Sequence, residues 1–513
     1  MTWSVKVAVI GTSIFLFGFV FGFYGFHKFL KSQIAKNAAL VEGTDMRANW
    51  EKTPIAVEFR IYLFNVTNPE EVHKGAKPIV QEVGPFCYDE WKEKVGFSDN
   101  PEEDEVSFHM KNTWIFNKDC YGNTEEAGLT GEEMITVPNA ALLSLALMVE
   151  KDTPALLTMA NRGIPHLYNH QKTVFVTAKA KEILFEGIYL NCTSKDFAAV
   201  ALCTGIRMNA KGLHKINDNL FKFSFFGVKN GTADEARLTV KRGSQNIKDL
   251  GRVVALNGKA EMKVWDGPEC NQIEGTDTTI FPPFTQPSED LTSFSPDVCR
   301  SMGAKYQRPS SYKGIKTNFY TASLGDMSKN PEEKCFCPTP TTCHKKGIFD
   351  ITKCTGAPIW LSLPHFYDTD PFYLSQVEGL SPDIEKHQIF VEFEPFTGTP
   401  LAARKRMQFN IPIHKIKKIE LMRELPDALL PIFWIEEGLE LGDEYIDLLE
   451  NKLFRTMRMV GVARWVMLIV GLAMIGIGGY AYFANPQTVD LVKQPGGPPP
   501  PEKHSASSVS PRY

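Results

Sequence analysis

The sequence predicts an α+β protein in which a large antiparallel sheet and a group of helices lie between two membrane-spanning helices. Three observations predict this class: an apolar run near each end of the 513-residue chain, recurrent β-branched and aromatic runs between turn residues, and one region with helical periodicity. The formal net charge of -4 indicates no strongly basic face, so no nucleic-acid partner is expected.

The two apolar runs are long enough to cross a bilayer. Residues 5–26 read VKVAVIGTSIFLFGFVFGFYGF with Lys6 as their one charge, and a helix of that length spans about 33 Å. The run is longer than the core of a cleavable signal peptide and ends in bulky residues, which indicates an uncleaved anchor. Residues 461–484 contain the charge-free stretch WVMLIVGLAMIGIGGYAYFA, with aromatic residues near both ends. Two transmembrane helices are therefore expected.

Two spans place both termini, residues 1–4 and 485–513, on one side of the membrane. Basic residues flank the long loop, which the positive-inside rule alone would make cytoplasmic, but that rule does not govern long translocated domains. The loop holds all ten cysteines and the N-glycosylation sequons at Asn65, Asn191 and Asn230, which fits an oxidising compartment. We expect residues 27–460 to be extracellular at the plasma membrane and the Pro-, Gly- and Ser-rich tail to be a disordered cytoplasmic segment.

The extracellular region is expected to be one domain built on an antiparallel sheet. Runs rich in β-branched and aromatic residues, bounded by turn signals, recur along it. They lie at residues 56–64, 172–176, 220–226, 359–363, 389–394 and 407–413.

One region has the pattern of helices instead. Helices are predicted over residues 137–150, 153–163 and 177–187. Thr153 and Pro154 are typical of a helix start, and Gly187 of a helix end. The first helix is apolar on all sides, so it is either a buried core helix or a helix that faces a lipid or a ligand.

The sequence carries no common catalytic motif: HExxH, GxSxG, the Walker A loop and the dinucleotide fingerprint are all missing. His365 stands alone in SLPHF, as a core histidine would. We therefore expect no catalytic residue, no metal site and no cofactor, and hence no enzyme. The stretch CFCPTPTTCHKKGIFDITKC, residues 335–354, has CxC spacing rather than the CxxC spacing typical of zinc or redox sites, which favours structural disulfides.

Several motifs, taken in order, resemble the class B scavenger receptor family. They are FNVTNPEEV (64–72), EVGPF (82–86), GTDTTIFPPF (275–284), PDVCRS (296–301), the CFC cluster, GIFDITKC (347–354), LSLPHF (361–366), EPFTGTP (394–400) and LPIFWIEEG (430–438). The segments FNVTNPEEVHKGAKP and EVGPFCYDEWKEK are most similar to the insect sensory neuron membrane proteins of that family, and to the first of their two types.

This resemblance implies a large antiparallel β-barrel capped by an apical helical bundle, with an internal tunnel that leads towards the membrane. Members bind and pass on lipids, so the implied partners are a small hydrophobic ligand, such as a fatty acid or a fatty-derived pheromone, and the lipid bilayer. For the sensory branch a neighbouring odorant receptor complex is a further implied partner. The three predicted helices would be the apical bundle and the ligand entrance.

The resemblance also implies positions. Family members that take up anionic particles carry apical lysines, where this sequence has Arg162, His166, His170 and Lys172, which suits small neutral ligands better. The candidates for the apical entrance are Leu142, Leu143, Leu147, Met148, Leu156, Met159, Leu184 and Phe185. The implied disulfides join Cys270 with Cys335, Cys299 with Cys354, and Cys337 with Cys343; Cys192 and Cys203 are candidates for a fourth, and Cys87 and Cys120 stay unassigned.

Two other classes share parts of this pattern. An adhesion or cargo-trafficking receptor would need no lipid transfer. A purified protein that carries no lipid and shows no saturable lipid binding would favour this class. A two-span ligand-gated channel would need a polar stripe within its spans, which neither apolar run offers.

Overall fold

The computed structural model describes residues 2–119, 128–209, 212–339 and 341–484. It divides into two compact units: the helices of residues 2–29 and 452–484, and the domain of residues 30–451. The disordered tail predicted for residues 485–513 lies outside the described residues.

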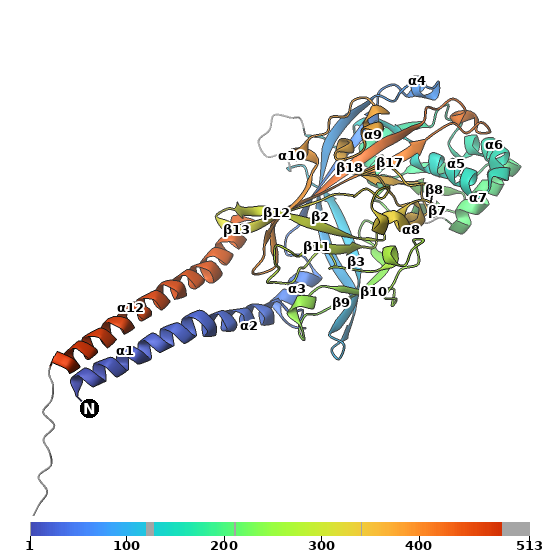
Figure 1. The fold of residues 1–513 in the computed structure, drawn as a ribbon. Coiled ribbons are helices and arrows are strands. Elements are labelled where there is room, and N and C mark those ends of the chain that lie inside the picture. The colour runs from blue at the N-terminus through green and yellow to red at the C-terminus, as the bar shows by residue number, and fades with distance from the viewer. Residues whose placement is uncertain (1, 120–127, 210–211, 340, 485–513) are drawn as a thin grey trace, which may run out of the picture. The chain divides into compact units, whose positions relative to one another are not determined.

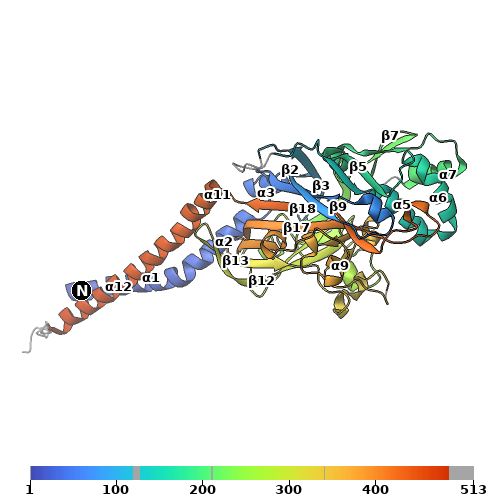
Figure 2. The same ribbon diagram turned by 90° about the horizontal axis from the view of Figure 1, so that it is seen from above.

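The larger unit is built on an antiparallel sheet that is nearly closed into a barrel (Figures 1 and 2). Its strands follow the order β10-β9-β3-β2-β1-β18-β17-β16-β13-β12-β11, with β15 paired to β17 and β14 to β15. The strands are β1 Val57–Val66, β2 Val80–Asn100, β3 Glu105–Phe116, β9 Ala233–Lys241, β10 Val253–Leu256, β11 Leu291–Ser295, β12 Arg300–Tyr312, β13 Ile315–Ala322, β14 Phe349–Asp350, β15 Trp360–Ser362, β16 Ile389–Glu394, β17 Thr399–Ile413 and β18 Ala428–Glu440. The predicted barrel is confirmed.

A short segment, residues 275–277, hydrogen-bonds to both edge strands of the sheet. Val253 N on β10 donates to Gly275 O at 2.9 Å, and Thr276 N donates to Thr292 O on β11 at 3.0 Å. Gly275 has φ +84°, and a Cβ there would lie 2.3 Å from Thr292 O, so this approach requires glycine. The GTDTT motif thus bridges the two ends of the barrel sheet.

Helices and two small sheets form the rest of the domain. The apical helices are α5 (Ala140–Asp152), α6 (Leu157–Leu167, preceded by the 3-10 turn Pro154–Leu156) and α7 (Phe197–Asn209). The small sheets are β4 (Met134–Pro138) with β5 (Phe175–Lys179), and β6 (Ile188–Asn191) with β8 (Leu220–Phe223) and β7 (Leu213–Asn217). Short helices are α3 (Asp45–Glu51), α4 (Pro69–His73), α8 (Thr352–Thr355), α9 (Pro371–Ser375), α10 (Ile384–His387) and α11 (Asp443–Leu448).

The helix predicted over residues 177–187 is correct only for its later part. Residues 177–179 belong to β5, which pairs with β4, whereas residues 180–186 are helical and end in the π-helical turn Glu182–Glu186. β5 pairs with β4 from Phe175 opposite Pro138 to Lys179 opposite Met134, and that tertiary pairing overrides the helix propensity of TAKAKE. The third apical helix is instead α7, which the sequence analysis missed.

The smaller unit contains two helices long and apolar enough to cross a membrane, Trp3–Ala38 and Asp443–Ala484, whose outer parts extend into the larger unit. Within the unit, α1 (Trp3–Val20) packs on α12 (Arg455–Ala484) through glycines. A Cβ on Gly11 would lie 2.7 Å from Met474 Cβ, and one on Gly478 would lie 2.8 Å from Ala8 N. Small residues therefore let the two backbones approach closely.

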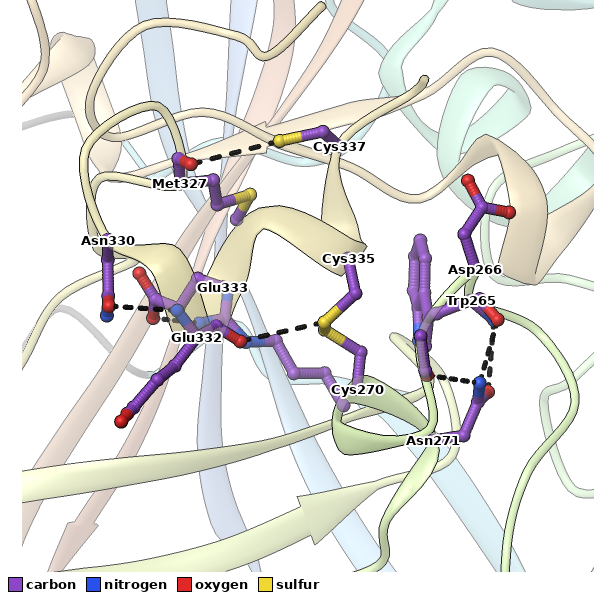
Figure 3. Close-up of a disulfide and its surroundings, with 12 residues drawn as sticks. Trp265, Asp266, Cys270, Asn271, Met327, Asn330, Glu332, Glu333, Cys335 and Cys337 are labelled. Carbon is purple, nitrogen blue, oxygen red and sulfur yellow. Dashed lines mark hydrogen bonds and ion pairs between the residues drawn. A yellow bond between two sulfur atoms is a disulfide. The ribbon is translucent and has the colours of Figure 1, made fainter. Parts of the chain in front are cut away.

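The described residues form the disulfides that the resemblance implied, Cys270–Cys335, Cys299–Cys354 and Cys337–Cys343, together with Cys192–Cys203. Figure 3 shows Cys335, on the 3-10 turn Pro331–Phe336, joined to Cys270. Beside it, Asn271 Nδ2 donates to Trp265 O at 2.7 Å and so orders the chain around Cys270. Cys87 is also disulfide-bonded, and Cys120 lies outside the described residues.

Candidate functional site

The apical helices form a small bundle over one end of the barrel (Figure 2). The side chain of Asn139 caps α5 by accepting from Leu142 N, and that of Asp196 caps α7 by accepting from Ala198 N at 2.8 Å. Gly163 allows α6 to approach α7, because a Cβ there would lie 2.7 Å from Leu202 Cδ1 and 2.9 Å from Ala198 O. The Cys192–Cys203 disulfide ties α7 to the segment before it.

The structure divides the eight proposed entrance residues into two groups. Leu142, Leu143, Leu147 and Leu184 are buried in the domain core. Met148 and Leu156 are exposed, whereas Met159 and Phe185 are half-buried. The buried face of α5 is therefore core, and only the second group can meet a ligand at the surface.

The most exposed apolar side chains of the apex lie on α7, which the sequence analysis missed. Phe197 and Met208 are 78% and 76% exposed, and Val200 is also exposed. An aspartate cap followed by the apolar run FAAVALC was the sequence signal for this helix. An apolar helix face of this kind marks a surface that contacts something oily.

Beneath the start of α5 lies an apolar cavity of about 10 Å³, room for about one water molecule. Its lining comes from the β4–α5 junction, β5, β6 and the segment after β8: Val137, Pro138, Asn139, Ala140, Ala141, Tyr168, Val176, Ile183, Ile188, Leu190, Phe223 and Phe225. No ligand larger than water fits unless these side chains or α5 move.

Aromatic rings lead from this cavity into the barrel. Phe225, which lines the cavity, lies 4.7 Å from the ring of Phe433 on β18, and Phe433 lies 5.6 Å from Phe226. Phe226 in turn lies 5.6 Å from Trp114 on β3. These rings form a continuous apolar path from the apical bundle to the inner face of β2 and β3, and we name it the aromatic path.

Charged side chains gather where the aromatic path ends. Lys92 on β2 pairs with Glu437 on β18 and lies 3.7 Å from Glu90, while Lys405 on β17 lies 3.4 Å from Glu437. Burial, chiefly, raises the pKa of Glu90 to about 7. Burial opposes ionisation of Glu437 too, but the charges of Lys92 and Lys405 lower its pKa to about 2. Lys229 and Asp297 form a further pair at 2.5 Å, and the charge of Lys92 acts on Asp297.

A polar groove of about 320 Å³ opens beside α6, lined by His73, Asn161, Ile164, Pro165, His170, Gln171, Lys172, Ile419, Glu420 and Leu421. Of the four apical residues singled out in the sequence, His170 and Lys172 line this groove, and His166 lies 5.1 Å from His170, ring to ring. Arg162 instead pairs with Asp196 at 2.7 Å, so its charge is compensated.

The sequon asparagines differ in their surroundings. Asn230 donates from Nδ2 to Trp114 O at 3.3 Å and accepts from Trp114 N, and Asn65 accepts from Thr136 N. Asn191 accepts only from its own sequon residue, Thr193, in the contacts described. Asn191 is the sequon whose side chain is tied to no distant segment.

A buried network surrounds His365, outside the aromatic path. Its Nε2 lies 2.5 Å from Glu82 Oε2, which also accepts from Trp434 Nε1 at 2.7 Å, and its Nδ1 accepts from Ser381 N. The ring of His387 stacks on His365 at 4.5 Å, and its Nδ1 accepts from Asp383 N. The Nδ1 atoms of both rings thus accept from backbone N–H groups and fix the local chain. The described residues contain no cluster of three potential metal ligands.

This network predicts acid sensitivity. Burial and the neighbouring His365 lower the pKa of His387 from 6.5 to about 4. The unfolded chain therefore binds a proton below pH 6.5 that the folded chain does not bind until about pH 4. His387 thus makes the free energy of unfolding decrease as the pH is lowered from 6.5 to about 4. We expect His387 to contribute a loss on the order of 2 kcal/mol between pH 7 and pH 4.5. Glu90, whose pKa is raised to about 7, contributes with the opposite sign in this window, so the His387 contribution is measured as the difference in thermal unfolding between the unaltered protein and a His387 variant.

The matched variants are His387→Gln, which should flatten the pH dependence, and His170→Gln at the exposed apex, which should leave it unchanged. An unaltered slope in His387→Gln would contradict the assignment.

The amino-acid sequence is similar to that of a known family and of several known proteins. The model of the CD36 family matches residues 9–482. Sensory neuron membrane protein 1 of Apis mellifera is 44% identical over 480 residues, which cover 94% of this chain and 91% of that protein. The protein of the same name from Manduca sexta is 44% identical over 480 residues (93% and 91%), and that from Ostrinia nubilalis 43% over 486 residues (94% and 91%).

Proposed function

Because the chain belongs to the CD36 family, the class B scavenger receptors, we propose that this membrane receptor captures small hydrophobic ligands at its apex and passes them through the barrel interior. Fatty acids and fatty-derived pheromones are the proposed ligands, and the membrane or a neighbouring odorant receptor is the proposed recipient. The names of the relatives support a sensory neuron as the setting. We place the domain outside the plasma membrane and both termini in the cytoplasm.

The observation that carries this proposal is the aromatic path, which begins beneath α5 and reaches Trp114 inside the barrel. An oily chain gains about 0.8 kcal/mol for each CH2 removed from water, so a 14-carbon chain has roughly 10 kcal/mol of gross driving force before ordering costs. The exposed apolar face of α7 would offer the first contact.

Passage requires motion, because the cavity under α5 holds about one water molecule. The helices themselves are candidates for that motion, since α5 meets the barrel through its own apolar side chains. A ligand that moves between these side chains would exchange one apolar contact for another, so its passage needs no catalysis.

The test fills this cavity. Ala141→Phe adds a ring where Ala141 lines the cavity, and Ala155→Phe makes the same change at an exposed position. Uptake of a labelled fatty acid into cells should fall about tenfold for Ala141→Phe, the effect of a barrier raised by about 1.4 kcal/mol, and stay unchanged for Ala155→Phe.

Surface labelling must find equal amounts of both variants, because overpacking can cost about 1–3 kcal/mol. Equal uptake by the two variants at equal surface amounts would contradict the apical route. Full-length protein that binds no lipid at all would favour an adhesion or cargo-trafficking receptor.

A further inference from the structure

The inner face of β2 and β3, where the aromatic path ends, carries polar atoms that no described protein group satisfies. They are Glu90 Oε2, Asn112 Oδ1 and Trp114 Nε1. Glu90 is 2% exposed and Trp114 8% exposed, so both are withdrawn from solvent. Buried polar atoms without a partner are rare in folded proteins, and each one requires an explanation.

The strand register places these residues beside one another. Glu90 lies directly opposite Trp114 in the β2–β3 ladder, and Lys92 lies opposite Asn112 two residues along. Residues two apart on a strand share a face, so all four side chains belong to the inner face of the two strands. Lys92 Nζ is 3.7 Å from Glu90 Oε2, which is longer than a hydrogen bond.

The hydrogen-bonding capacities of these three atoms are complemented by one kind of ligand group. Trp114 Nε1 can only donate and Asn112 Oδ1 can only accept, whereas the Glu90 carboxyl accepts when ionised and also donates when protonated. An aldehyde or an ester only accepts, so it would leave Asn112 Oδ1 without a donor. A hydroxyl both donates and accepts, and so complements the indole on one side and the carboxylate or amide oxygen on the other.

The charges nearby disfavour a carboxylate. Lys92 and Lys405 contact Glu437, and Lys229 contacts Asp297, so each of these cations has an anionic partner. A ligand carboxylate would add a negative charge beside Glu90, whose own ionisation burial already opposes. The site is therefore matched to a polar group without charge.

We propose that Glu90, Asn112 and Trp114 form a site for the hydroxyl end of a long-chain alcohol, whose hydrocarbon tail lies along the aromatic path towards the apex. This inference rests on the proposed function and gives it a ligand class. The tail contacts the rings from Phe226 to Phe225, and the headgroup stops at the charged side chains of the barrel interior. The barrel thus holds the ligand in one orientation, polar end inward.

The experiment measures binding of tritiated hexadecan-1-ol to the full-length protein in phosphatidylcholine nanodiscs. Trp114→Phe keeps an aromatic ring and removes the N–H, and should weaken alcohol binding roughly tenfold. The matched control is Trp91→Phe, the same change on the neighbouring strand β2 but on the opposite face of the sheet, which should bind as the unaltered protein does. Competition by hexadecane, which has no headgroup, should be the same in all three proteins.

A second variant tests the acceptor. Glu90→Gln supplies an amide N–H that can donate to an ester, so it should shift the preference from hexadecanol towards hexadecyl acetate. The unaltered protein should prefer hexadecanol to both hexadecyl acetate and hexadecanoic acid.

Equal alcohol binding by Trp114→Phe and Trp91→Phe, or tighter binding of the acid than of the alcohol, would overturn the headgroup site. If hexadecane still competes in that case, the hydrophobic route survives without it. If neither hexadecane nor any of the headgroup ligands binds, the headgroup site and the proposed function both fail.

Discussion

Replacement of Asp277 by alanine is expected to cost about 3–5 kcal/mol and to abolish surface expression, because it leaves a buried lysine without its counter-charge. The Asp277 side chain is fully buried; its Oδ2 accepts from Trp50 Nε1 at 2.9 Å and lies 3.7 Å from Lys94 Nζ. Lys94 is itself 2% exposed, and burial lowers its pKa to about 8. Denaturant unfolding of the purified protein measures the loss.

The same position also anchors the segment that bridges the barrel sheet, so the double variant separates charge from geometry. Lys94→Met/Asp277→Ala removes both charges and should be more stable than Asp277→Ala alone. The conservative Asp277→Asn should fall between the unaltered protein and Asp277→Ala. A double variant less stable than Asp277→Ala would contradict the charge argument.

Removal of the Cys270–Cys335 disulfide is expected to cost about 4 kcal/mol, because the bond closes a loop with a sequence separation of 65 residues. Removal of Cys337–Cys343, with a separation of 6, should cost about 2 kcal/mol. The comparison uses paired serine variants, Cys270→Ser/Cys335→Ser and Cys337→Ser/Cys343→Ser. Guanidinium unfolding without reductant measures both.

The two bonds share one short segment, so each is a control for local damage around the other. An equal decrease in the free energy of unfolding in both variants would contradict the argument that loop length decides how much each disulfide stabilises the fold. If Cys270→Ser/Cys335→Ser were as stable as the unaltered protein, the Cys270–Cys335 disulfide would not stabilise the fold.

The sequence predicted the family, the membrane helices and the shorter strands, and the family model confirms the resemblance. Residues 389–394 coincide with β16, and residues 407–413 end β17. The long strands β2 and β3 were not predicted. The inner face of β2 carries Glu90, Lys92 and Lys94, so the alternation that marks a half-buried strand is missing there. On β3 the alternation is present in Val106, Phe108 and Trp114, and the sequence analysis missed it.

The candidate site was less predictable than the fold. The entrance residues on α5 were chosen because the helix is apolar, but apolar character does not distinguish a core face from a ligand-facing surface, and Leu142 and Leu143 are in the core. Trp114 and Glu90 gave no local signal, since only the pairing of β2 with β3 and the position of Phe226 bring them to one place. Trp50 and Asp277 meet across 227 residues of chain for the same reason.

The bridging segment of residues 275–277 has a consequence for contacts between copies of the chain. By hydrogen-bonding to β10 and β11, it occupies backbone groups that two outermost strands would otherwise offer to any extended peptide. Fewer edge-strand groups are therefore left for pairing with the strands of a neighbouring copy. This cover depends on the glycine at position 275, because a side chain there would collide with Thr292 O.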